Sequence, residues 1–179
     1  MSRIQVGDKL FSKEIPYEQI LSAIKRMASE IMRDYKESEP LFLCVLNGSF
    51  MFAADLLKEY SGACQVSFIK LASYRGTSST EEVKTLIGLN EDINGRDVII
   101  LEDIIDTGIT ISQLLQDLKT YQPTSIRVAT FLLKPAALRT NVNPDYIGIK
   151  IPNDFIVGYG LDYNGLGRNF KDIYKIVVE

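Results

Sequence analysis

Hydrophobic residues recur at three- and four-residue steps between positions 17 and 36, a spacing typical of one face of an amphipathic helix. The apolar positions of this face are Ile20, Leu21, Ile24, Met27, Ala28, Ile31 and Met32. Pro16 precedes them and suits the first helical turn. Helical spacing returns at residues 49–60 and at about 110–120, so the pattern predicts three helices.

Short apolar runs lie between these helices and are typical of buried strands. They occupy residues 41–46, 63–71, 83–88, 98–101 and 125–133. Strands that alternate with helices indicate βαβ units, and therefore a central parallel sheet flanked by helices in an α/β fold. The polar stretch 73–80 has nothing to bury, and we expect it to be a mobile loop.

The last forty residues depart from this alternation. Short β-like pieces at residues 146–151, 155–159 and 173–178 surround a glycine-rich turn at 164–167, which predicts a small C-terminal hood, or flap. A length of 179 residues suits one domain with a complete core. We therefore expect a single domain over residues 1–179. Its core would span about 17–135, and its hood about 136–179 together with the N-terminal residues.

The composition excludes several kinds of chemistry. The chain has no histidine, which rules out Ser-His and Cys-His nucleophile systems and histidine-bound zinc. A formal net charge of -3 argues against nucleic acid as the main partner, because phosphate backbones attract basic surfaces. Catalysis would have to use carboxylates, lysine, arginine, tyrosine, hydroxyl groups or a hard metal ion.

The same sequence favours the cytoplasm. It contains no apolar run approaching the ~18 residues that cross a bilayer and no apolar leader, so we expect no membrane association. Cys44 and Cys64 each lie inside an apolar run, which predicts two buried, reduced thiols rather than a disulfide. A cytoplasmic location fits both observations.

The strongest candidate for a functional site begins where the strand at 98–101 runs into Glu102 and Asp103. Two adjacent carboxylates are costly to bury without cations or donors, and ligands of open α/β sheets bind at the carboxyl ends of strands. The next segment, Asp106-Thr107-Gly108-Ile109-Thr110, supplies hydroxyl and backbone N–H groups at a helix start. These groups form an anion-binding cup, so the site predicts a ligand with a diol or metal at one end and phosphate at the other.

Each of these residues alone has a plain structural explanation, such as a solvated strand end or a helix cap at Thr110. The whole string 98–110, however, resembles the phosphoribosyl pyrophosphate signature of the type I phosphoribosyltransferases. The pair Glu102-Asp103 followed by Ile-Ile-Asp-Thr-Gly is most similar to the hypoxanthine-guanine branch of that family. The resemblance extends over about 41–179 and implies the type I phosphoribosyltransferase fold.

The resemblance implies roles for the signature residues. Glu102 and Asp103 would face the ribose hydroxyls, and Asp106 would lie near purine N7 as the catalytic acid or base. The 5′-phosphate would be bound by Thr107, Gly108, Thr110 and the backbone N–H of Ile109.

Residues downstream of the signature would hold the purine and pyrophosphate. By resemblance, Lys134 donates to the purine O6, Phe155 stacks on the base and the backbone of Ile156 meets its edge. Asp162 would lie beside the purine as a magnesium ligand, and Arg168 would bind pyrophosphate. Taken singly, Lys134 could be a solvated strand end, Phe155 a core residue and Asp162 part of an ordinary turn.

Two loops complete the implied site. Ser73 and Tyr74 match the pair on the flexible loop that closes over the reaction centre. The loop Leu46-Asn47-Gly48 matches the pyrophosphate loop, whose first peptide is often cis in the family. Some family members have a lysine at the position of Asn47. A contribution of that lysine charge to pyrophosphate affinity or to contacts between subunits is therefore in doubt for this chain.

The implied reaction is magnesium-dependent displacement of pyrophosphate from phosphoribosyl pyrophosphate by a 6-oxopurine, with the metal near Glu102, Asp103 and Asp162. Enzymes for xanthine, adenine, uracil or orotate share the signature, although Lys134 argues against adenine because an ammonium group cannot accept from a 6-amino group. An RNA-binding regulator of this fold and an inactive α/β domain are further alternatives.

Family members usually assemble, and Phe50, Met51 and Phe52 form an aromatic-rich run that suggests a homodimer or homotetramer.

Overall fold

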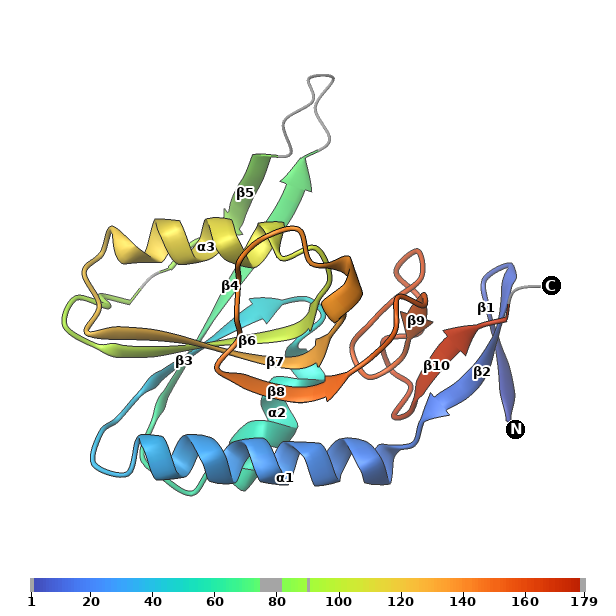
Figure 1. Ribbon diagram of the computed structural model, residues 1–179, viewed down its shortest axis with the longest axis horizontal. Coiled ribbons are helices and arrows are strands. Elements are labelled where there is room, and N and C mark those ends of the chain that lie inside the picture. The colour runs from blue at the N-terminus through green and yellow to red at the C-terminus, as the bar shows by residue number, and fades with distance from the viewer. Residues whose placement is uncertain (1, 75–81, 90, 178–179) are drawn as a thin grey trace.

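The chain forms a large sheet between helices and a smaller sheet at one end, which carries both termini (Figure 1). This computed structural model describes residues 2–74, 82–89 and 91–177, and for residues 72–74 and 82–87 it describes the backbone alone. No helix of the described residues is long and apolar enough to cross a membrane.

The large sheet has six strands in the order β5-β4-β3-β6-β7-β8. Their bounds are β3 Leu41–Leu46, β4 Gln65–Tyr74, β5 Glu82–Ile87, β6 Asp97–Ile105, β7 Ser125–Leu133 and β8 Tyr146–Lys150. Only the edge strand β5 runs antiparallel to its neighbour, so the other five form the expected parallel sheet. Register is continuous across the centre, where Leu41 of β3 pairs with Gln65 on one side and Val98 on the other.

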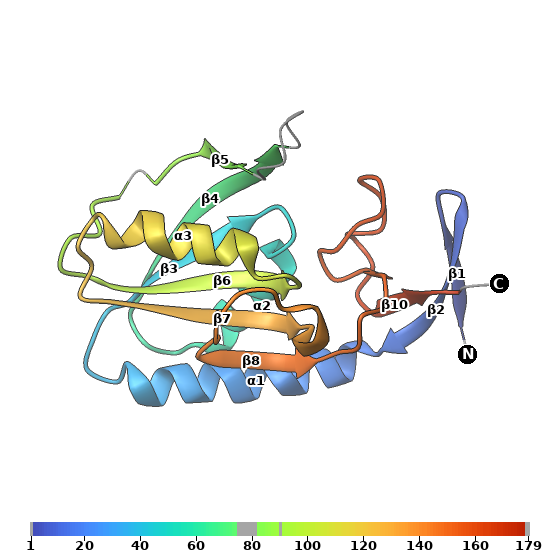
Figure 2. The same ribbon diagram turned by 45° about the horizontal axis from the view of Figure 1, so that its top comes forward.

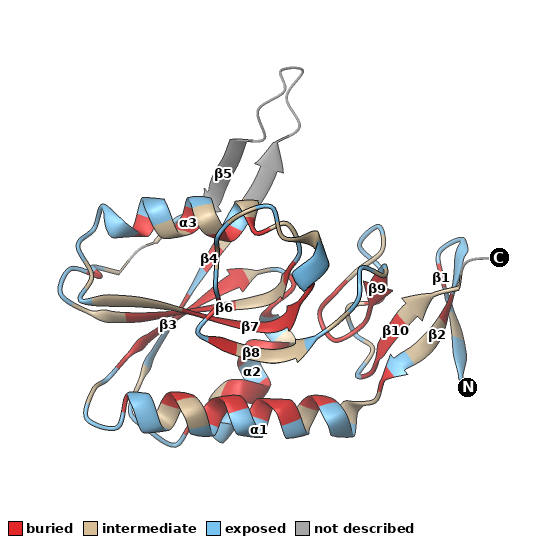
Figure 3. Ribbon diagram, viewed as in Figure 1, coloured by how far each residue is buried: buried red, intermediate tan, exposed pale blue. Residues whose placement is uncertain are grey.

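Three helices cover this sheet. Helices α1 Tyr17–Asp34 and α2 Phe50–Glu59 lie on one face, and α3 Ile109–Lys119 lies on the other (Figure 1). Strand β3 shows why both faces need cover, because alternate residues point to opposite sides of the pleat. Phe42 and Cys44 belong to the core under α1 and α2, whereas Leu41 and Leu43 belong to the core under α3. Figure 3 shows the resulting band of buried residues along the central strands.

The smaller sheet is the hood, defined here as strands β1, β2, β9 and β10 with the residues that join β9 to β10. The order is β1-β2-β10-β9, with β1 Arg3–Val6, β2 Lys9–Ile15, β9 Ile156–Val157 and β10 Ile173–Ile176. The chain enters the large sheet region through residues 15–17 and returns through 150–156 (Figure 2). The hood has its own small core, in which Phe11 is fully buried beside Val157 and Tyr174.

The sequence pattern predicted the main sheet well, with several corrections. Strand β6 continues to Ile105 rather than ending at 101, so the acidic pair lies within a strand. Strand β4 includes Ser73 and Tyr74, which were expected in a loop, and the rest of that loop lies outside the described residues. Strand β8 was assigned to the hood but is the edge of the large sheet. Cys44 is buried as expected, whereas Cys64 is only half-buried.

The N-terminal hairpin was the main omission, since no element was expected before residue 16. Strands β1 and β2 pair with each other, and β2 also pairs with β10 from the opposite end of the chain. The apolar spacing of β2 is irregular, with Leu10 exposed next to buried Phe11. Its partner strand, which no local pattern identifies, determines its place in the fold.

Asp172 ties the hood to the start of α1. Its Oδ1 accepts the backbone N–H of Tyr17 at 2.8 Å, and its Oδ2 pairs with Lys13 Nζ at 2.5 Å. Desolvation acts to raise the pKa of Asp172, but the hydrogen bonds from Lys13 and Tyr17 outweigh it and lower the pKa below its usual value. The ionised carboxylate therefore stabilises the folded state above about pH 4, and this contribution is lost as the pH falls through the lowered pKa.

We expect Asp172→Asn to reduce the free energy of unfolding at pH 7 by about 1.5–3 kcal/mol, the range for a hydrogen bond to a charged group. At pH 3, below the usual pKa of an aspartate, the two proteins should differ less, because the stabilisation is lost progressively as the pH falls toward the lowered pKa. Urea titrations at both pH values measure this difference. An equal gap at pH 7 and pH 3 would contradict the role of the charge.

Candidate active site

The predicted site residues of the large sheet gather at one edge. Strands β3, β6 and β7 are parallel neighbours, and their carboxyl ends carry Gly48, Glu102 to Thr110, and Lys134 respectively. The carboxyl ends of parallel strands are where open α/β sheets bind ligands. The fold thus brings three separate parts of the sequence to a common edge.

Glu102 and Asp103 form the acidic centre of this edge. Desolvation raises the pKa of Glu102, and the charge of Asp103 raises it further. Desolvation also raises the pKa of Asp103, although Arg168 and the backbone N–H of Ile104, 2.8 Å from its Oδ1, act in the opposite direction. Glu102 Oε2 is buried without a hydrogen-bond partner among the described residues. The site therefore has a buried carboxyl oxygen, unpartnered in the described part of the chain, which a bound cation or hydroxyl group could satisfy.

The segment after the acidic pair forms the expected cup. Gly108 has φ +81, in the left-handed region, and immediately precedes α3. Thr107 Oγ1 accepts the N–H of Ile109 at 3.4 Å, so the hydroxyl organises the start of the helix. A cavity of about 130 Å³ lies against this turn. It is lined by Glu102, Ile104, Ile105, Asp106, Thr107, Gly108, Thr110 and Ile111.

Lys134 and Asp106 meet directly. Lys134 Nζ lies 3.0 Å from Asp106 Oδ2, with the lysine side chain 9% exposed and the aspartate 48% exposed. The backbone N–H of Lys134 donates to Ile105 O at 3.0 Å, which fixes the end of β7 beside β6. A buried cation and an accessible carboxylate therefore stand side by side next to the cup.

The hood contributes Asp162 and Arg168. Arg168 Nη2 lies 2.6 Å from Asp162 Oδ1, and Asp162 Oδ2 accepts the N–H of Gly165 at 2.7 Å. Among the described residues no three acidic, cysteine or histidine side chains are grouped as for a metal ion, so Asp162 does not join Glu102 and Asp103 in one cluster. Arg168 nevertheless lies close enough to lower the pKa of Asp103, which relates the hood to the acidic centre.

The two halves of the site meet backbone to backbone at Gly48 and Gly160. A side chain on Gly48 would overlap the carboxylate of Asp103, and a side chain on Gly160 would overlap the carbonyl oxygen of Gly48. The Leu46–Asn47 peptide that leads into this contact is cis. Gly160 was not among the predicted site residues, although the sequence Gly158-Tyr159-Gly160 already signals unusual backbone angles.

Phe155 and Ile156 are positioned by packing. Phe155 is 45% exposed, and its ring packs against Phe11 at 6.3 Å and Tyr163 at 5.9 Å. Ile156 is buried in the core under α1 and α2. The side chains of Ser73 and Tyr74 lie outside what the structure describes.

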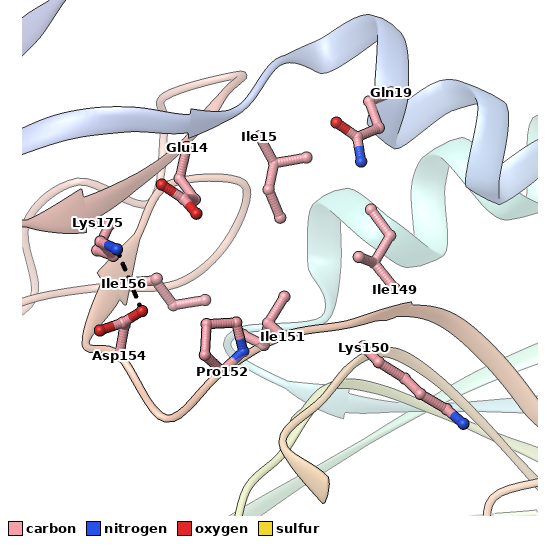
Figure 4. Close-up of a pocket in the computed structure, with 10 residues that line it drawn as sticks. All are labelled: Glu14, Ile15, Gln19, Ile149, Lys150, Ile151, Pro152, Asp154, Ile156 and Lys175. Carbon is pink, nitrogen blue, oxygen red and sulfur yellow. Dashed lines mark ion pairs between the residues drawn. The ribbon is translucent and has the colours of Figure 1, made fainter.

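A second cavity, of about 190 Å³, lies at the seam where both chain crossings join hood and large sheet (Figure 4). Its rim includes the ion pair between Lys175 and Asp154 at 3.3 Å, and its wall includes Ile149 and Ile156. Of the predicted site residues only Ile156 lines it. This cavity lacks the acidic pair and the phosphate cup, so the cup at the end of β6 is the candidate reaction centre.

Comparison with known proteins agrees with this geometry. The phosphoribosyl transferase domain family matches residues 16–164, and the chain belongs to this family. The hypoxanthine phosphoribosyltransferase of Escherichia coli K12 is 40% identical over 167 residues, 92% of this chain and 94% of that protein. The hypoxanthine-guanine phosphoribosyltransferase of Mycobacterium tuberculosis H37Rv is 42% identical over 166 residues, covering 89% and 81%.

Among solved structures, a hypoxanthine-guanine phosphoribosyltransferase from Bacillus anthracis superposes with a TM-score of 0.89 at 36% identity. The superposition covers 93% of this chain and 98% of that chain. The prediction of a type I phosphoribosyltransferase fold is therefore confirmed.

The contact between the two glycines yields a prediction with an internal control. Gly165 has φ +81 with open space around its Cα, so Gly165→Ala should cost only the left-handed backbone, about 1–2 kcal/mol. Gly160→Ala adds an overlap with the carbonyl of Gly48 and should cost about 3 kcal/mol or more. Urea titration of both variants tests this order, and equal costs would show that Gly48 and Gly160 can separate freely.

Proposed function

We propose that this protein transfers the 5-phosphoribosyl group of phosphoribosyl pyrophosphate to hypoxanthine or guanine, giving IMP or GMP and pyrophosphate in purine salvage. The observation that carries the proposal is the Lys134–Asp106 pair, 3.0 Å apart beside the phosphate cup. A 6-oxopurine presents N7 and O6 side by side on one edge. An ammonium donor for O6 and a carboxylate for the proton at N7 match that edge.

The remaining proposed site residues divide the substrate between them. Thr107, Gly108, Thr110 and the backbone N–H of Ile109 would hold the 5′-phosphate at the start of α3. Leu46, Asn47, Gly48 and Arg168 would face pyrophosphate, with Ser73 and Tyr74 on the strand that leads to the covering loop. Phe155 and Ile156 would hold the base, with Asp162 beside it.

The acidic centre fits a Mg²⁺ ion. Its two carboxylates have raised pKa values, and Glu102 has a buried oxygen without a partner among the described residues. Magnesium prefers oxygen ligands and keeps several waters or substrate oxygens, so two protein carboxylates suffice. We propose that Glu102 and Asp103 hold the ion, and that Asp162, which is not grouped with them, contributes from the hood through oxygens of the bound pyrophosphate. When bound, the ion supplies positive charge against the departing pyrophosphate.

The protein's own groups account for the other requirements of the reaction. The negative charge of Glu102 and Asp103 favours the positive charge that develops on the ribose as pyrophosphate leaves. Asp106, the proposed catalytic residue, is exposed enough to reach the purine and would exchange the proton at N7. Lys134 holds O6, which orients the attacking nitrogen toward the sugar.

We further propose that the chain acts as one folding unit in the cytoplasm, in which the hood consists of the N-terminal strands and the segment that follows β8. The described residues of the site offer no feature that favours an RNA-binding regulator, a uracil enzyme or an inactive domain. Xanthine shares the 6-oxo group with hypoxanthine and guanine, so it remains an alternative base.

The direct test is incubation of the protein with phosphoribosyl pyrophosphate, Mg²⁺ and each of hypoxanthine, guanine, xanthine, adenine and uracil. We expect the first two to be converted and adenine not, because Lys134 offers only donors. Lys134→Ala should raise KM for the base more than KM for the sugar substrate. Faster turnover of adenine or uracil than of hypoxanthine would contradict the proposal, as would full activity after Mg²⁺ is chelated.

Asp106→Asn separates chemistry from binding. The amide preserves shape and hydrogen bonding but cannot accept the purine proton, so kcat should fall on the order of 10²-fold or more. Binding of phosphoribosyl pyrophosphate should change far less, whereas Thr110→Val should weaken it by removing a phosphate donor. Single-turnover measurements distinguish the two. A near-normal chemical rate in Asp106→Asn with greatly weakened sugar binding would show that its role is misassigned.

We also propose a homodimer or homotetramer. Phe52 is buried in the core, but Phe50 on α2 is 42% exposed. Val66 and Phe68 on β4, which are 40% and 46% exposed, pair with residues of β3 that face α1 and α2, so they extend an apolar surface on this side. Light scattering at micromolar concentration should show a multiple of the chain mass that falls in Phe68→Lys. A wild-type particle of one chain would contradict assembly.

A further inference from the structure

The hood reaches the large sheet through a backbone segment of unusual conformation. Gly158, Tyr159 and Gly160 all have positive φ, at +99, +49 and +96. Glycine adopts such angles readily, whereas a tyrosine does so only at a cost in free energy. Contacts made by the Tyr159 side chain must therefore hold the residue in this conformation.

Those contacts are made with the core. The Tyr159 ring is 1% exposed and packs against Phe131 at 5.2 Å and Tyr17 at 6.2 Å. Its hydroxyl donates to Asp55 Oδ2 at 2.8 Å, which joins the hood to helix α2 across 104 residues of sequence. This hydrogen bond is buried, because both Tyr159 and Asp55 are less than a tenth exposed.

Asp55 is held in place independently of Tyr159. Lys58, one turn along α2, lies 2.5 Å from Asp55 Oδ1, and the Tyr17 hydroxyl donates to Oδ2 at 3.2 Å. Desolvation acts to raise the pKa of Asp55, but Lys58 and the two tyrosine hydroxyls outweigh it and lower the pKa. The carboxylate is therefore a fixed, ionised acceptor to which Tyr159 attaches.

The residue next to Tyr159 reaches the proposed pyrophosphate site. Gly160 lies against the carbonyl oxygen of Gly48. The N–H of Gly160 donates to Arg168 O at 3.0 Å, and Arg168 Nη1 donates to Gly160 O at 2.7 Å. Arg168 in turn pairs with Asp162. A shift of Tyr159 would therefore displace Gly48, Arg168 and Asp162 relative to one another.

We infer that Tyr159, through its hydrogen bond to Asp55, is a positioning residue that sets the hood segment 158–160 against the pyrophosphate loop 46–48. Its effect falls on binding of the pyrophosphate group rather than on the purine, because Lys134 and Asp106 are placed by β6 and β7 without it. This inference deepens the proposed function and rests on it for the identity of the sugar substrate.

The test is Tyr159→Phe, which keeps the ring and removes only the hydroxyl. We expect KM for phosphoribosyl pyrophosphate to rise about tenfold, the scale of one lost hydrogen bond to a charged acceptor. KM for hypoxanthine should stay within about twofold, because β6 and β7 place Lys134 and Asp106. Phe155 is held by its packing on Phe11 and Tyr163. Calorimetric binding of inorganic pyrophosphate with Mg²⁺ should weaken in parallel, and this readout needs no turnover.

Two control variants separate positioning from general destabilisation. Tyr146→Phe removes another buried hydroxyl that donates to a carboxylate, Asp34, at 2.8 Å, but at the amino-terminal end of β8. Tyr17→Phe removes the other tyrosine hydroxyl bound to Asp55 and keeps the Tyr17 ring that packs against Tyr159. Both should lower thermal stability and leave both KM values near wild type. A rise in the sugar KM as large in Tyr146→Phe as in Tyr159→Phe would overturn the inference.

The remaining outcomes are also distinct. Unchanged pyrophosphate binding and unchanged KM in Tyr159→Phe, with an active wild type, would overturn the inference and leave the proposed function intact. A wild type that converts no base, with pyrophosphate binding still weakened in Tyr159→Phe, would refute the proposed function and support the positioning role. If Tyr159→Phe does not fold, Asp55→Asn should show a smaller loss of pyrophosphate affinity, and an unchanged affinity would overturn the inference.

Discussion

The adjacent, half-buried carboxyl groups of Glu102 and Asp103 are the constraint around which the site is arranged. Two carboxylates within a central strand are stable only if cations, donors or a ligand compensate them. The structure provides part of that compensation through Arg168 of the hood and the backbone N–H of Ile104. The raised pKa values and the unpartnered oxygen of Glu102 show that the compensation is incomplete among the described residues. A magnesium ion and a ribose would supply what is missing.

That constraint explains why the hood must be held precisely. The hood carries Asp162 and Arg168, yet it is joined to the large sheet by only two chain crossings. Backbone contact at Gly48 and Gly160 brings the halves together without intervening side chains. Asp172 fixes the hood at the start of α1, and Tyr159 fixes it on α2. The hydrogen bonds of Asp172 and Tyr159 between hood and large sheet thus hold in place the charged hood residues Asp162 and Arg168.

Membership of the phosphoribosyltransferase family accounts for the fold but leaves parts of this chain to be explained individually. The family match begins at residue 16 and ends at 164, so the N-terminal hairpin and β10 lie outside it. Those segments nevertheless support the hood, because Phe11 of β2 packs beneath the exposed ring of Phe155. Phe155, which we propose to hold the base, therefore depends on parts of the chain outside the matched family domain.

The sequence by itself determined the alternation of strands and helices, the acidic pair and the phosphate cup, because periodicity and adjacent residues express local physical requirements. It also identified Lys134, Phe155, Asp162 and Arg168 as candidates through their resemblance to the family. Only the tertiary structure decided that Lys134 pairs with Asp106, that β2 joins β10 and that Tyr159 reaches Asp55. These contacts join residues 28 to more than 100 positions apart, and no local pattern encodes them. They form because burial of apolar faces brings the segments together, and polar groups buried there must find partners.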